Sequence, residues 1–587
     1  MNIGRTLRDR ILARWTLGDR SLFSLCRSGL VGLLFAAALC FPGLRVTGRR
    51  FARHAPAQWL VLSALFLGLF TVAALWPLNK VEWGLIDDHE ILIETNRPGG
   101  FTFGNFVDKL RQHRELGGWG TKEDNIARYR PGYYFFRFLE TWLWQSNAHA
   151  WGRARIVIAA LSLWLFCLAL ARFSDPLFAL ACSLSVTAFP CWPDVWRYLG
   201  RGEVYSALGT AVAIYGFAIL WGGCAQPPML SRSVRSFGWL AMLCGFLIAF
   251  GAKENFLFLM LPILAVYVRD LWKKTAVPIL GHLTVISALA FIAVIVVILK
   301  LKLAQMGNLD VYGRSTESGH RLTFVLPALK AFFLSGQGLA LLGMSGCALL
   351  VAFFRRKKPR DFRNVVVAVV LTLGLSAGLF VFQYVFYVGG LENRYRFPAE
   401  FCWFGAMVSL AYWMTATPRL RGLEMSRWKK WLWRGVSLLA LAPVLILGPH
   451  RLTSETIIRV NQTQRFEEFL SRFAKVCAVD PQRPVVLEVT QIYAYEPAYA
   501  MPIMLKHFGV TNPLYLRYAP GVDLTATQSQ HLYDSLIKEL TAISNEGRFG
   551  YRPWPAGKDA TPANPLVVNL DADKAVTPGE WHGRAPW

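Results

Sequence analysis

Repeated apolar runs of near membrane-spanning length are the feature that most constrains this chain. The first clear one, WLVLSALFLGLFTVAALWP at 59–77, has the length that an α-helix needs to cross a bilayer, about 20 residues. Further apolar runs occur at 154–171, 177–192, 204–222, 237–252, 256–270, 277–299, 337–354, 365–388, 397–415 and 433–449. The sequence predicts an α-helical polytopic membrane protein with about eleven transmembrane helices, the shorter of them tilted, broken or only partly inserted.

The basic residues indicate topology rather than nucleic-acid binding. The chain has 63 Lys and Arg against 37 Asp and Glu, a formal net charge of +26. They form short clusters between apolar runs, as at 269–274, 355–363 and 417–434, and not a separate basic domain. Alternating the spans places these three clusters on one side, which the positive-inside rule makes the cytoplasm.

Three regions follow from this topology. Residues 1–58 are expected to be cytoplasmic or interfacial, with 23–44 as a re-entrant or interfacial helix rather than a cleaved signal peptide. Residues 59–449 form the transmembrane domain, with a first outer loop at 78–153. Residues 450–587 alternate helix-like stretches such as QRFEEFLSRFAKV with three strand-like runs, PVVLEV, PLYLRY and PLVVNL. This alternation predicts a soluble α/β domain on the outer face.

The unusual polar stretches all belong to the outer side of this topology. They are IDDHE at 86–90, ARYRPGYYFFRFLE at 127–140, CWPDVWRYLGRGEVY at 191–205, GAKENF at 251–256, MGNLDVYGR at 306–314 and GGLENRYRFP at 389–398. The inner loops instead carry mainly Lys and Arg. This asymmetry predicts a functional site on the outer face.

The acidic stretch offers acid-base chemistry. In a turn, either Asp87 or Asp88 can point into a cavity while its neighbour accepts hydrogen bonds or binds a divalent ion. Desolvation at the bilayer edge raises a carboxyl pKa and makes the carboxylate a better base. An ordinary polar helix end is the alternative interpretation, and His89 fits a hydrogen-bonding neighbour better than a catalyst.

The cations suit an anionic ligand. Lys253 lies between two apolar segments, where an ionised group needs a partner or a ligand, so it binds either a phosphate or a carboxylate from Glu254 or the acidic stretch. The arginines have guanidinium groups that match phosphoryl oxygens, or they could snorkel to lipid head groups. These arginines are Arg197, Arg201, Arg394 and Arg396. Together the groups describe a site for an anionic, lipid-linked substrate that undergoes acid-base chemistry.

The order of these motifs resembles the GT-C superfamily of polytopic glycosyltransferases, which use polyprenyl-phosphate or polyprenyl-diphosphate sugars. DDHE after the first span and YRPGYYFF about forty residues later resemble the first outer loop of the protein O-mannosyltransferases and the lipid A aminoarabinose transferase. AKEN and NRYRFP resemble later segments of the same enzymes, so the resemblance covers 59–415. DDHE stands where an Asp-Glu pair is commoner and YRPG where Pro-Pro is commoner, which leaves the sugar and the metal requirement open.

The resemblance implies an inverting transfer at the outer face of a bacterial inner membrane, to a glycan, lipid or protein acceptor. Asp87 would be the base, with Asp88 as its partner or in exchange for it, and a divalent cation such as Mg²⁺ or Mn²⁺ could assist with a diphosphate donor. The donor phosphate would be bound by Lys253, Arg394, Arg396, Arg201 and Arg197. The substrate would be lined by His89, Glu90, Tyr129, Arg130, Tyr133, Glu254, Tyr395 and Tyr312.

Two other functions compete with this one. A transporter or flippase for a lipid-linked glycan would place its charges nearer mid-bilayer, in interrupted helices of repeated halves, and the chain shows no internal repeat. A non-catalytic assembly factor whose outer domain binds a cell-wall polymer is the third.

Overall fold

A computed structural model describes residues 56–85, 87–96, 99–112, 130–173, 176–189, 191–221, 231–273, 277–305, 323–355, 359–386, 396–397, 399–401, 405, 427–489, 495–518 and 564–570. The expected helix at 23–44 lies outside these residues, as does most of the span expected at 397–415.

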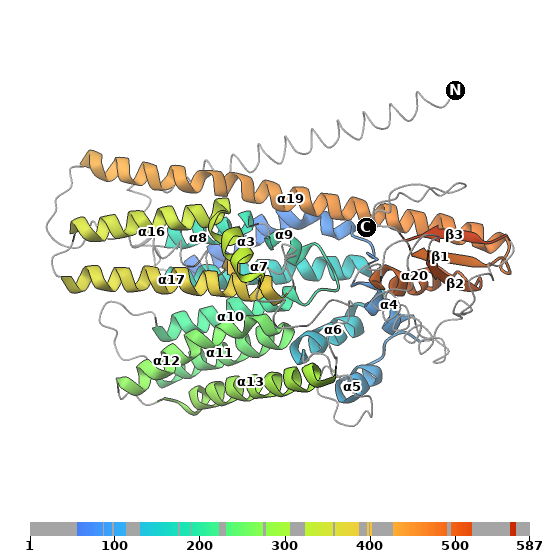
Figure 1. Ribbon diagram of the computed structural model, residues 1–587, viewed down its shortest axis with the longest axis horizontal. Coiled ribbons are helices and arrows are strands. Elements are labelled where there is room, and N and C mark those ends of the chain that lie inside the picture. The colour runs from blue at the N-terminus through green and yellow to red at the C-terminus, as the bar shows by residue number, and fades with distance from the viewer. Residues whose placement is uncertain are drawn as a thin grey trace.

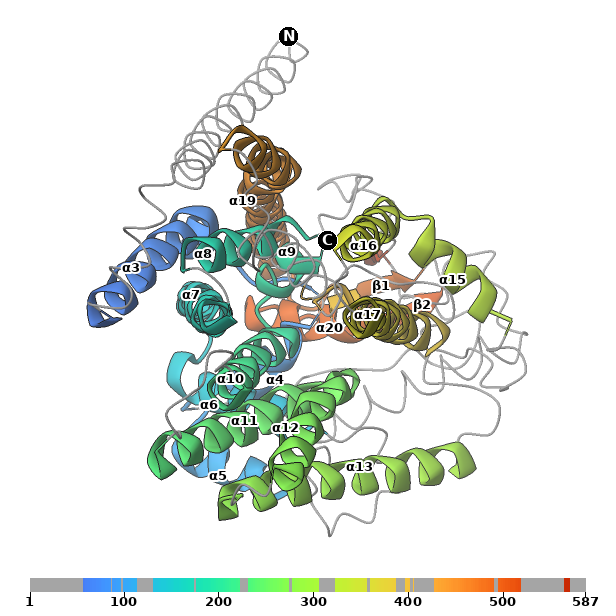
Figure 2. The same ribbon diagram turned by 90° about the vertical axis from the view of Figure 1, so that its left-hand side faces the viewer.

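Long apolar helices lying side by side form most of the molecule (Figures 1 and 2). They are α3 (Pro56–Leu75), α7 (Ala148–Phe173), α10 (Glu203–Trp221), α11 (Arg232–Ala252), α12 (Met260–Trp272), α13 (Ile279–Gln305), α16 (Gly336–Arg355) and α17 (Pro359–Phe386), with the shorter α15 (Val325–Phe333). In the described part of the chain, 6 helical segments are long and apolar enough to cross a membrane. The helical, membrane-embedded character is therefore confirmed, whereas the number of spans stays a prediction.

The span expected at 177–192 is not one helix. Helix α8 (Pro176–Ser185) is followed by a 3-10 turn, η3 (Val186–Ala188), and then by the short α9 (Cys191–Trp196). The break falls at Phe189, whose ψ of 138° is extended. Phe189 precedes Pro190, and a residue before proline is disfavoured in the helical region. The proline thus explains why α8 and α9 are separate helices.

Helices α10 and α11 approach each other through glycines. A Cβ atom on Gly209 would lie 2.4 Å from the backbone nitrogen of Ala249, and one on Gly245 would lie 2.3 Å from that of Ala213. Small residues of this kind let two helix backbones come into direct contact in a membrane. The contact brings the first residue of α10, Glu203, alongside the end of α11.

A single helix, α19 (Arg427–Val479, 53 residues), connects the membrane region to the C-terminal domain, which is called the outer domain after the side of the membrane that the sequence predicts for it. At about 1.5 Å per residue it is about 80 Å long, far more than a bilayer needs. Residue 450, which the sequence suggested as the domain boundary, lies inside this helix, and QRFEEFLSRFAKV is its outer half rather than a separate helix. The two regions are therefore joined by a continuous helix and not by a linker (Figure 1).

The described outer domain is a small parallel sheet packed on helices. Its strands are β1 (Val485–Val489), β2 (Leu514–Tyr518) and β3 (Leu566–Asn569), in the order β2-β1-β3, and α20 (Tyr495–His507) connects the first two. These strands coincide with the three strand-like runs of the sequence. Buried residues of α19, among them Phe466 and Phe473, share one hydrophobic core with Val485 and Met501. The sheet is thus anchored to the outer half of α19.

Short elements fill the space between the membrane helices and the sheet. A 3-10 turn, η1 (Trp76–Lys80), ends α3 and leads to α4 (His89–Thr95), α5 (Phe103–Gln112) and α6 (Pro131–Trp144), and another, η4 (Glu254–Leu259), joins α11 to α12. In Figure 1, α4, α5 and α6 lie at the same end of the helices as the sheet. Of the polar residues that the sequence singled out, those around the Asp87 turn lie at this end.

Candidate functional site

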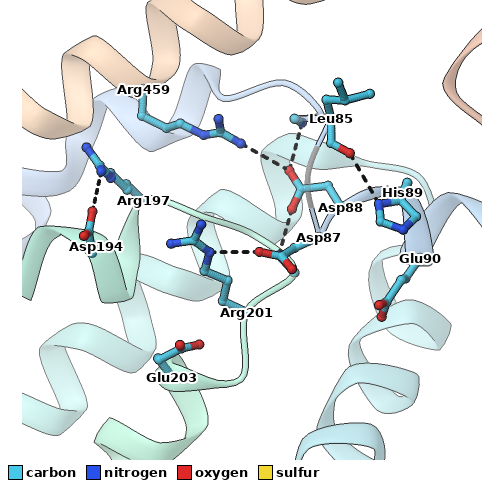
Figure 3. A network of polar contacts seen from close by, with 12 residues as sticks. Leu85, Asp87, Asp88, His89, Glu90, Asp194, Arg197, Arg201, Glu203 and Arg459 are labelled. Atoms are coloured by element: carbon cyan, nitrogen blue, oxygen red, sulfur yellow. Dashed lines mark hydrogen bonds and ion pairs between the residues drawn. The ribbon is translucent and has the colours of Figure 1, made fainter. Parts of the chain in front are cut away.

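The turn before α4 sends two neighbouring carboxylates in different directions. Asp87 has a φ of +69°, in the left-handed region, which Asp adopts more readily than most residues other than glycine. Asp88 returns to a right-handed conformation as the residue preceding α4. Figure 3 shows the result: Asp87 points toward Arg201 and Asp88 points toward Arg459.

Asp88 is wholly engaged with backbone amides. One of its carboxylate oxygens accepts the N–H of Gly84 at 2.8 Å and the other accepts the N–H of Gly200 at 2.9 Å. The residue is 0% exposed. Burial raises the pKa of this carboxyl, and the Arg459 guanidinium and the two amides counteract that rise. Asp88 therefore joins two loops distant in sequence, and its geometry is that of a structural carboxylate.

Both glycines are required by the closeness of these contacts. A Cβ atom on Gly200 would lie 2.5 Å from the carbonyl oxygen of Asp87. A Cβ atom on Gly84 would lie 1.9 Å from the guanidinium of Arg459 and 3.0 Å from the Asp88 carboxylate. Only a residue without a side chain lets the backbone come so near to the two aspartates.

Asp87 is the more accessible of the pair. Its side chain is 27% exposed, against 1% for that of Asp88. One carboxylate oxygen accepts a hydrogen bond of 2.9 Å from Nε of Arg201. The ion pair keeps the carboxylate close to a cation while part of the group stays open to solvent.

Helix α6 holds the turn from the opposite side. Arg137 donates hydrogen bonds of 2.9 Å to the carbonyl oxygens of both Asp87 and Gly200, and it pairs with Glu90 at 2.9 Å. Tyr133, one helical turn earlier, donates to the same Gly200 carbonyl at 2.7 Å. Tyr133 was expected near the substrate, but Arg137 was missed. Its position four residues after Tyr133 on one helix face is the signal that could have found it.

Three arginines surround the ring of Tyr198. The guanidinium carbons of Arg201, Arg459 and Arg197 lie 3.2, 4.3 and 5.2 Å from the ring centroid. Arg197 also forms an ion pair with Asp194 of α9 and another of 2.5 Å with Glu455 of α19. Stacking on an aromatic face suits guanidinium groups and stabilises them where water is scarce.

Arg459 is the residue that the sequence analysis missed most clearly. It comes from the outer half of α19, about 370 residues after Asp88, and no motif marks it. Its side chain is 6% exposed, and its terminal nitrogen lies 3.8 Å from the Asp88 carboxylate. A weak signal exists, because Arg459, Thr463 and Glu467 recur every four residues and therefore lie on one face of the helix.

Lys253 forms an ion pair with Glu203, and both residues are buried. The sequence predicts a phosphate or a carboxylate from Glu254 or the acidic stretch as the partner of this lysine. The structure corrects that prediction, because the partner is Glu203. The reason is the close packing of α10 on α11, which places the start of one helix against the end of the other. Gly202 links this pair to α6, since a Cβ there would lie 3.0 Å from the ring of Tyr133.

The outer domain covers the side of the turn that carries His89. The rings of His89 and Tyr499 of α20 meet edge to face at 5.4 Å, and Nδ1 of His507 lies 2.8 Å from the side-chain oxygen of Asn96. His89 also places Nδ1 3.3 Å from the carbonyl oxygen of Leu85, so it acts as a hydrogen-bonding neighbour. Burial lowers the pKa of both histidines, which favours their neutral forms.

The remaining expected site residues are distributed as follows. Arg130 precedes the first turn of α6, and Glu254 begins the 3-10 turn after Lys253. Arg396 is half-buried, and the ring of its neighbour Phe397 packs 6.1 Å from that of Trp192 on α9. Four others lie outside the described residues: Tyr129, Tyr312, Arg394 and Tyr395. The structure thus gathers Asp87, Asp88, His89, Glu90, Arg197 and Arg201 in one site (Figure 3). Tyr133 reaches this site through the Gly200 carbonyl, and Lys253 is paired with Glu203 next to it.

The residues around Asp87 do not fit a divalent cation. Such ions take several oxygen ligands. Here both Asp88 oxygens accept backbone amides and Asp87 is paired with Arg201. Within the described ranges no group of three His, Cys, Asp or Glu side chains could hold a metal ion.

In comparisons with known proteins, no protein-family model, curated protein or solved structure matches the chain.

Proposed function

We propose that this protein is a glycosyltransferase that moves a sugar from a polyprenyl-phosphate or polyprenyl-diphosphate donor to an acceptor at the outer face of a bacterial inner membrane. The main support for the proposal is that Asp87 and Asp88, although adjacent, differ in burial and in binding partners. Asp88 is buried and bound to two amides, whereas Asp87 is partly exposed and paired with Arg201. A partly desolvated carboxylate beside a cation is suited to remove a proton from a hydroxyl next to an anionic leaving group.

Asp87 is the base in this proposal. The acceptor hydroxyl loses its proton to the Asp87 carboxylate as its oxygen attacks the anomeric carbon. The bond between that carbon and the phosphate oxygen breaks, and the lipid phosphate leaves with the electron pair. Attack opposite the leaving group inverts the anomeric centre. Arg201 would hold the carboxylate in place through its 2.9 Å hydrogen bond.

Two cations of the candidate site suit the charge that develops on the leaving phosphate. Arg201 contacts Asp87 directly, and Lys253 lies by Glu203, two residues further along the chain. Positive groups fixed at a site of low dielectric stabilise a developing anion more than they would in water. Arg197, Arg394 and Arg396 remain the further phosphate-binding candidates of the proposal.

The first prediction concerns Asp87. We expect Asp87→Asn to lower transfer from a radiolabelled polyprenyl-linked sugar at least about 100-fold, because loss of a general base typically costs 10²–10⁴ in rate. Donor binding should persist, because Arg201 and Lys253 are unchanged. The measurement is sugar incorporation by purified protein in lipid vesicles, with folding checked by the thermal unfolding midpoint.

The matched control is Asp108→Asn, which removes an exposed carboxylate of α5 in the same outer loop and should leave transfer unchanged. Full transfer by Asp87→Asn would refute the assignment of the base. Movement of a lipid-linked glycan across vesicles by both variants, without any transfer by the unaltered protein, would favour a flippase.

A further inference from the structure

Three polar residues of α19, Arg459, Thr463 and Gln464, contact the loop that carries Asp87. Thr463 accepts the backbone N–H of Glu82 at 3.1 Å, and Gln464 donates to the carbonyl of Lys80 at 3.1 Å. Arg459, one turn before Thr463, reaches Asp88 at the far end of the same loop. Residues four apart lie on one face of a helix, so one face of α19 contacts the loop at both of its ends.

Arg459 differs from Thr463 and Gln464 because it acts through charge. It is 5% exposed, yet its Nε and terminal Nη2 make no hydrogen bond within the described part of the chain. The 3.8 Å separation from Asp88 is an ion pair without a hydrogen bond. A buried guanidinium is costly unless something compensates it, and the ring of Tyr198 and the carboxylate of Asp88 are the compensating groups.

Asp88, in turn, needs to be ionised to hold both loops. A carboxylate offers two acceptor oxygens, whereas a protonated carboxyl turns one of them into a donor. Both oxygens accept backbone N–H groups here, so protonation would weaken the bond to Gly84 or Gly200. Burial works against ionisation, and Arg459 opposes that effect. Other charged groups around the turn are Asp87 itself, Arg201, Arg197 and Arg137.

We propose that Arg459 is a positioning residue: its charge keeps Asp88 ionised, and Asp88 then holds the Gly84 and Gly200 amides that set the Asp87 turn. The inference deepens the proposed function, because it names the residue outside the transmembrane motifs on which the base depends. It also makes α19, which carries the outer domain, part of the machinery that positions Asp87.

The experiment is a double-mutant cycle between Arg459→Gln and Asp88→Asn. We expect Arg459→Gln to lower transfer at neutral pH about tenfold or more and to move the acid limb of the pH profile upward by about two units or more, since Asp88 would protonate at higher pH. In the Asp88→Asn background the same change should alter transfer less than about twofold, because the group through which Arg459 acts is gone.

Two further variants separate charge from packing. Arg459→Lys keeps the charge and should restore the pH profile. Arg472→Gln, on the same helix, removes an arginine whose side chain is 61% exposed and should change nothing. An unshifted profile in Arg459→Gln, or an equal loss in both backgrounds, would overturn the proposal.

A spectroscopic readout keeps this test separate from the proposed sugar transfer. Infrared spectra of protein with ¹³C-labelled aspartate should show a protonated carboxyl band at neutral pH in Arg459→Gln. The band should be absent from the unaltered protein and from the Arg459→Gln/Asp88→Asn variant. Its absence from Arg459→Gln would overturn the inference even if transfer is observed, and its presence would support the inference even if the substrate is not a sugar.

Failure to fold is also decisive. If Arg459→Gln is unfolded while the double variant folds, the loss of Arg459 acts through Asp88, as proposed. If neither variant folds, the packing of Arg459 on Tyr198 matters more than its charge, and the proposal is wrong.

Discussion

At the scale of single residues, the candidate site depends on close backbone approaches as much as on charged side chains. Asp87 and Asp88 have the same side chain, but the left-handed backbone of Asp87 makes the two carboxylates point in different directions. Their different surroundings follow from this. Gly84 and Gly200 then let two loops come within hydrogen-bonding distance of one carboxylate. The glycines therefore shape the surroundings of both carboxylates although they carry no functional group.

Gly200→Ala tests this dependence. Its Cβ would lie 2.5 Å from the Asp87 carbonyl oxygen, a backbone atom that cannot move aside cheaply. We expect the free energy of unfolding to fall by about 1–3 kcal/mol, as for other overpacked positions, and transfer to fall with it. Thermal unfolding in detergent measures the effect. In the control, Gly104→Ala, the Cβ meets nothing closer than 3.6 Å, and equal losses in both variants would contradict the steric argument.

At the scale of elements, α4 and α20 form a contact that depends on neutral histidines. Burial lowers the pKa of His89 and of His507, so each binds its proton less readily in the folded protein than in the unfolded chain. Stability from such groups is present above the unfolded pKa of about 6.5 and is lost as the pH falls through the lower folded pKa. The contact between the membrane region and the outer domain should therefore weaken in acid.

The corresponding prediction uses His507, which lies 2.8 Å from Asn96. We expect the thermal unfolding midpoint to fall as the pH is lowered from about 7.5 to about 5.5, and we expect His507→Gln to reduce that dependence, because glutamine does not titrate in this range. The comparison variant is His282→Gln, at a histidine that contacts Tyr267 on the membrane helices. An unchanged pH dependence in His507→Gln would exclude this histidine as a cause.

At the scale of the whole molecule, α19 belongs to both the membrane region and the outer domain. The apolar first part of α19 lies among the membrane helices, and its outer half supports both the Asp87 loop and the sheet (Figure 1). A deletion of residues 460–587 would consequently remove Thr463 and Gln464 together with the outer domain. Loss of activity after that deletion would not by itself assign acceptor recognition to the sheet.

Thiol labelling tests the orientation of the whole molecule. In a background without the native cysteines, we expect a membrane-impermeant reagent to label Gln482→Cys, an exposed position beside the sheet, in intact cells with a permeable outer membrane. Lys273→Cys, exposed at the opposite end after α12, should react only after the inner membrane is broken. The basic clusters at that end set the direction. Labelling of Lys273→Cys in intact cells would reverse the topology.

The sequence by itself determined the helical membrane class, the three strands of the outer domain and the end of the molecule at which the polar residues gather. These follow from local rules: apolar length, alternation and the distribution of Lys and Arg act over short stretches of chain. It also limited the proposed base to Asp87 or Asp88 and marked Tyr133, Lys253, Arg197 and Arg201 as members of the candidate site.

Only the tertiary structure decided the role of each group. The accessibility of Asp87, the two amides on Asp88, the pairing of Lys253 with Glu203 and the arrival of Arg459 all depend on contacts between elements far apart in the chain. Burial and charge pairing are properties of three-dimensional neighbours, so two adjacent aspartates that look alike in sequence acquire different environments once α6, α19 and the segment before α10 close around them.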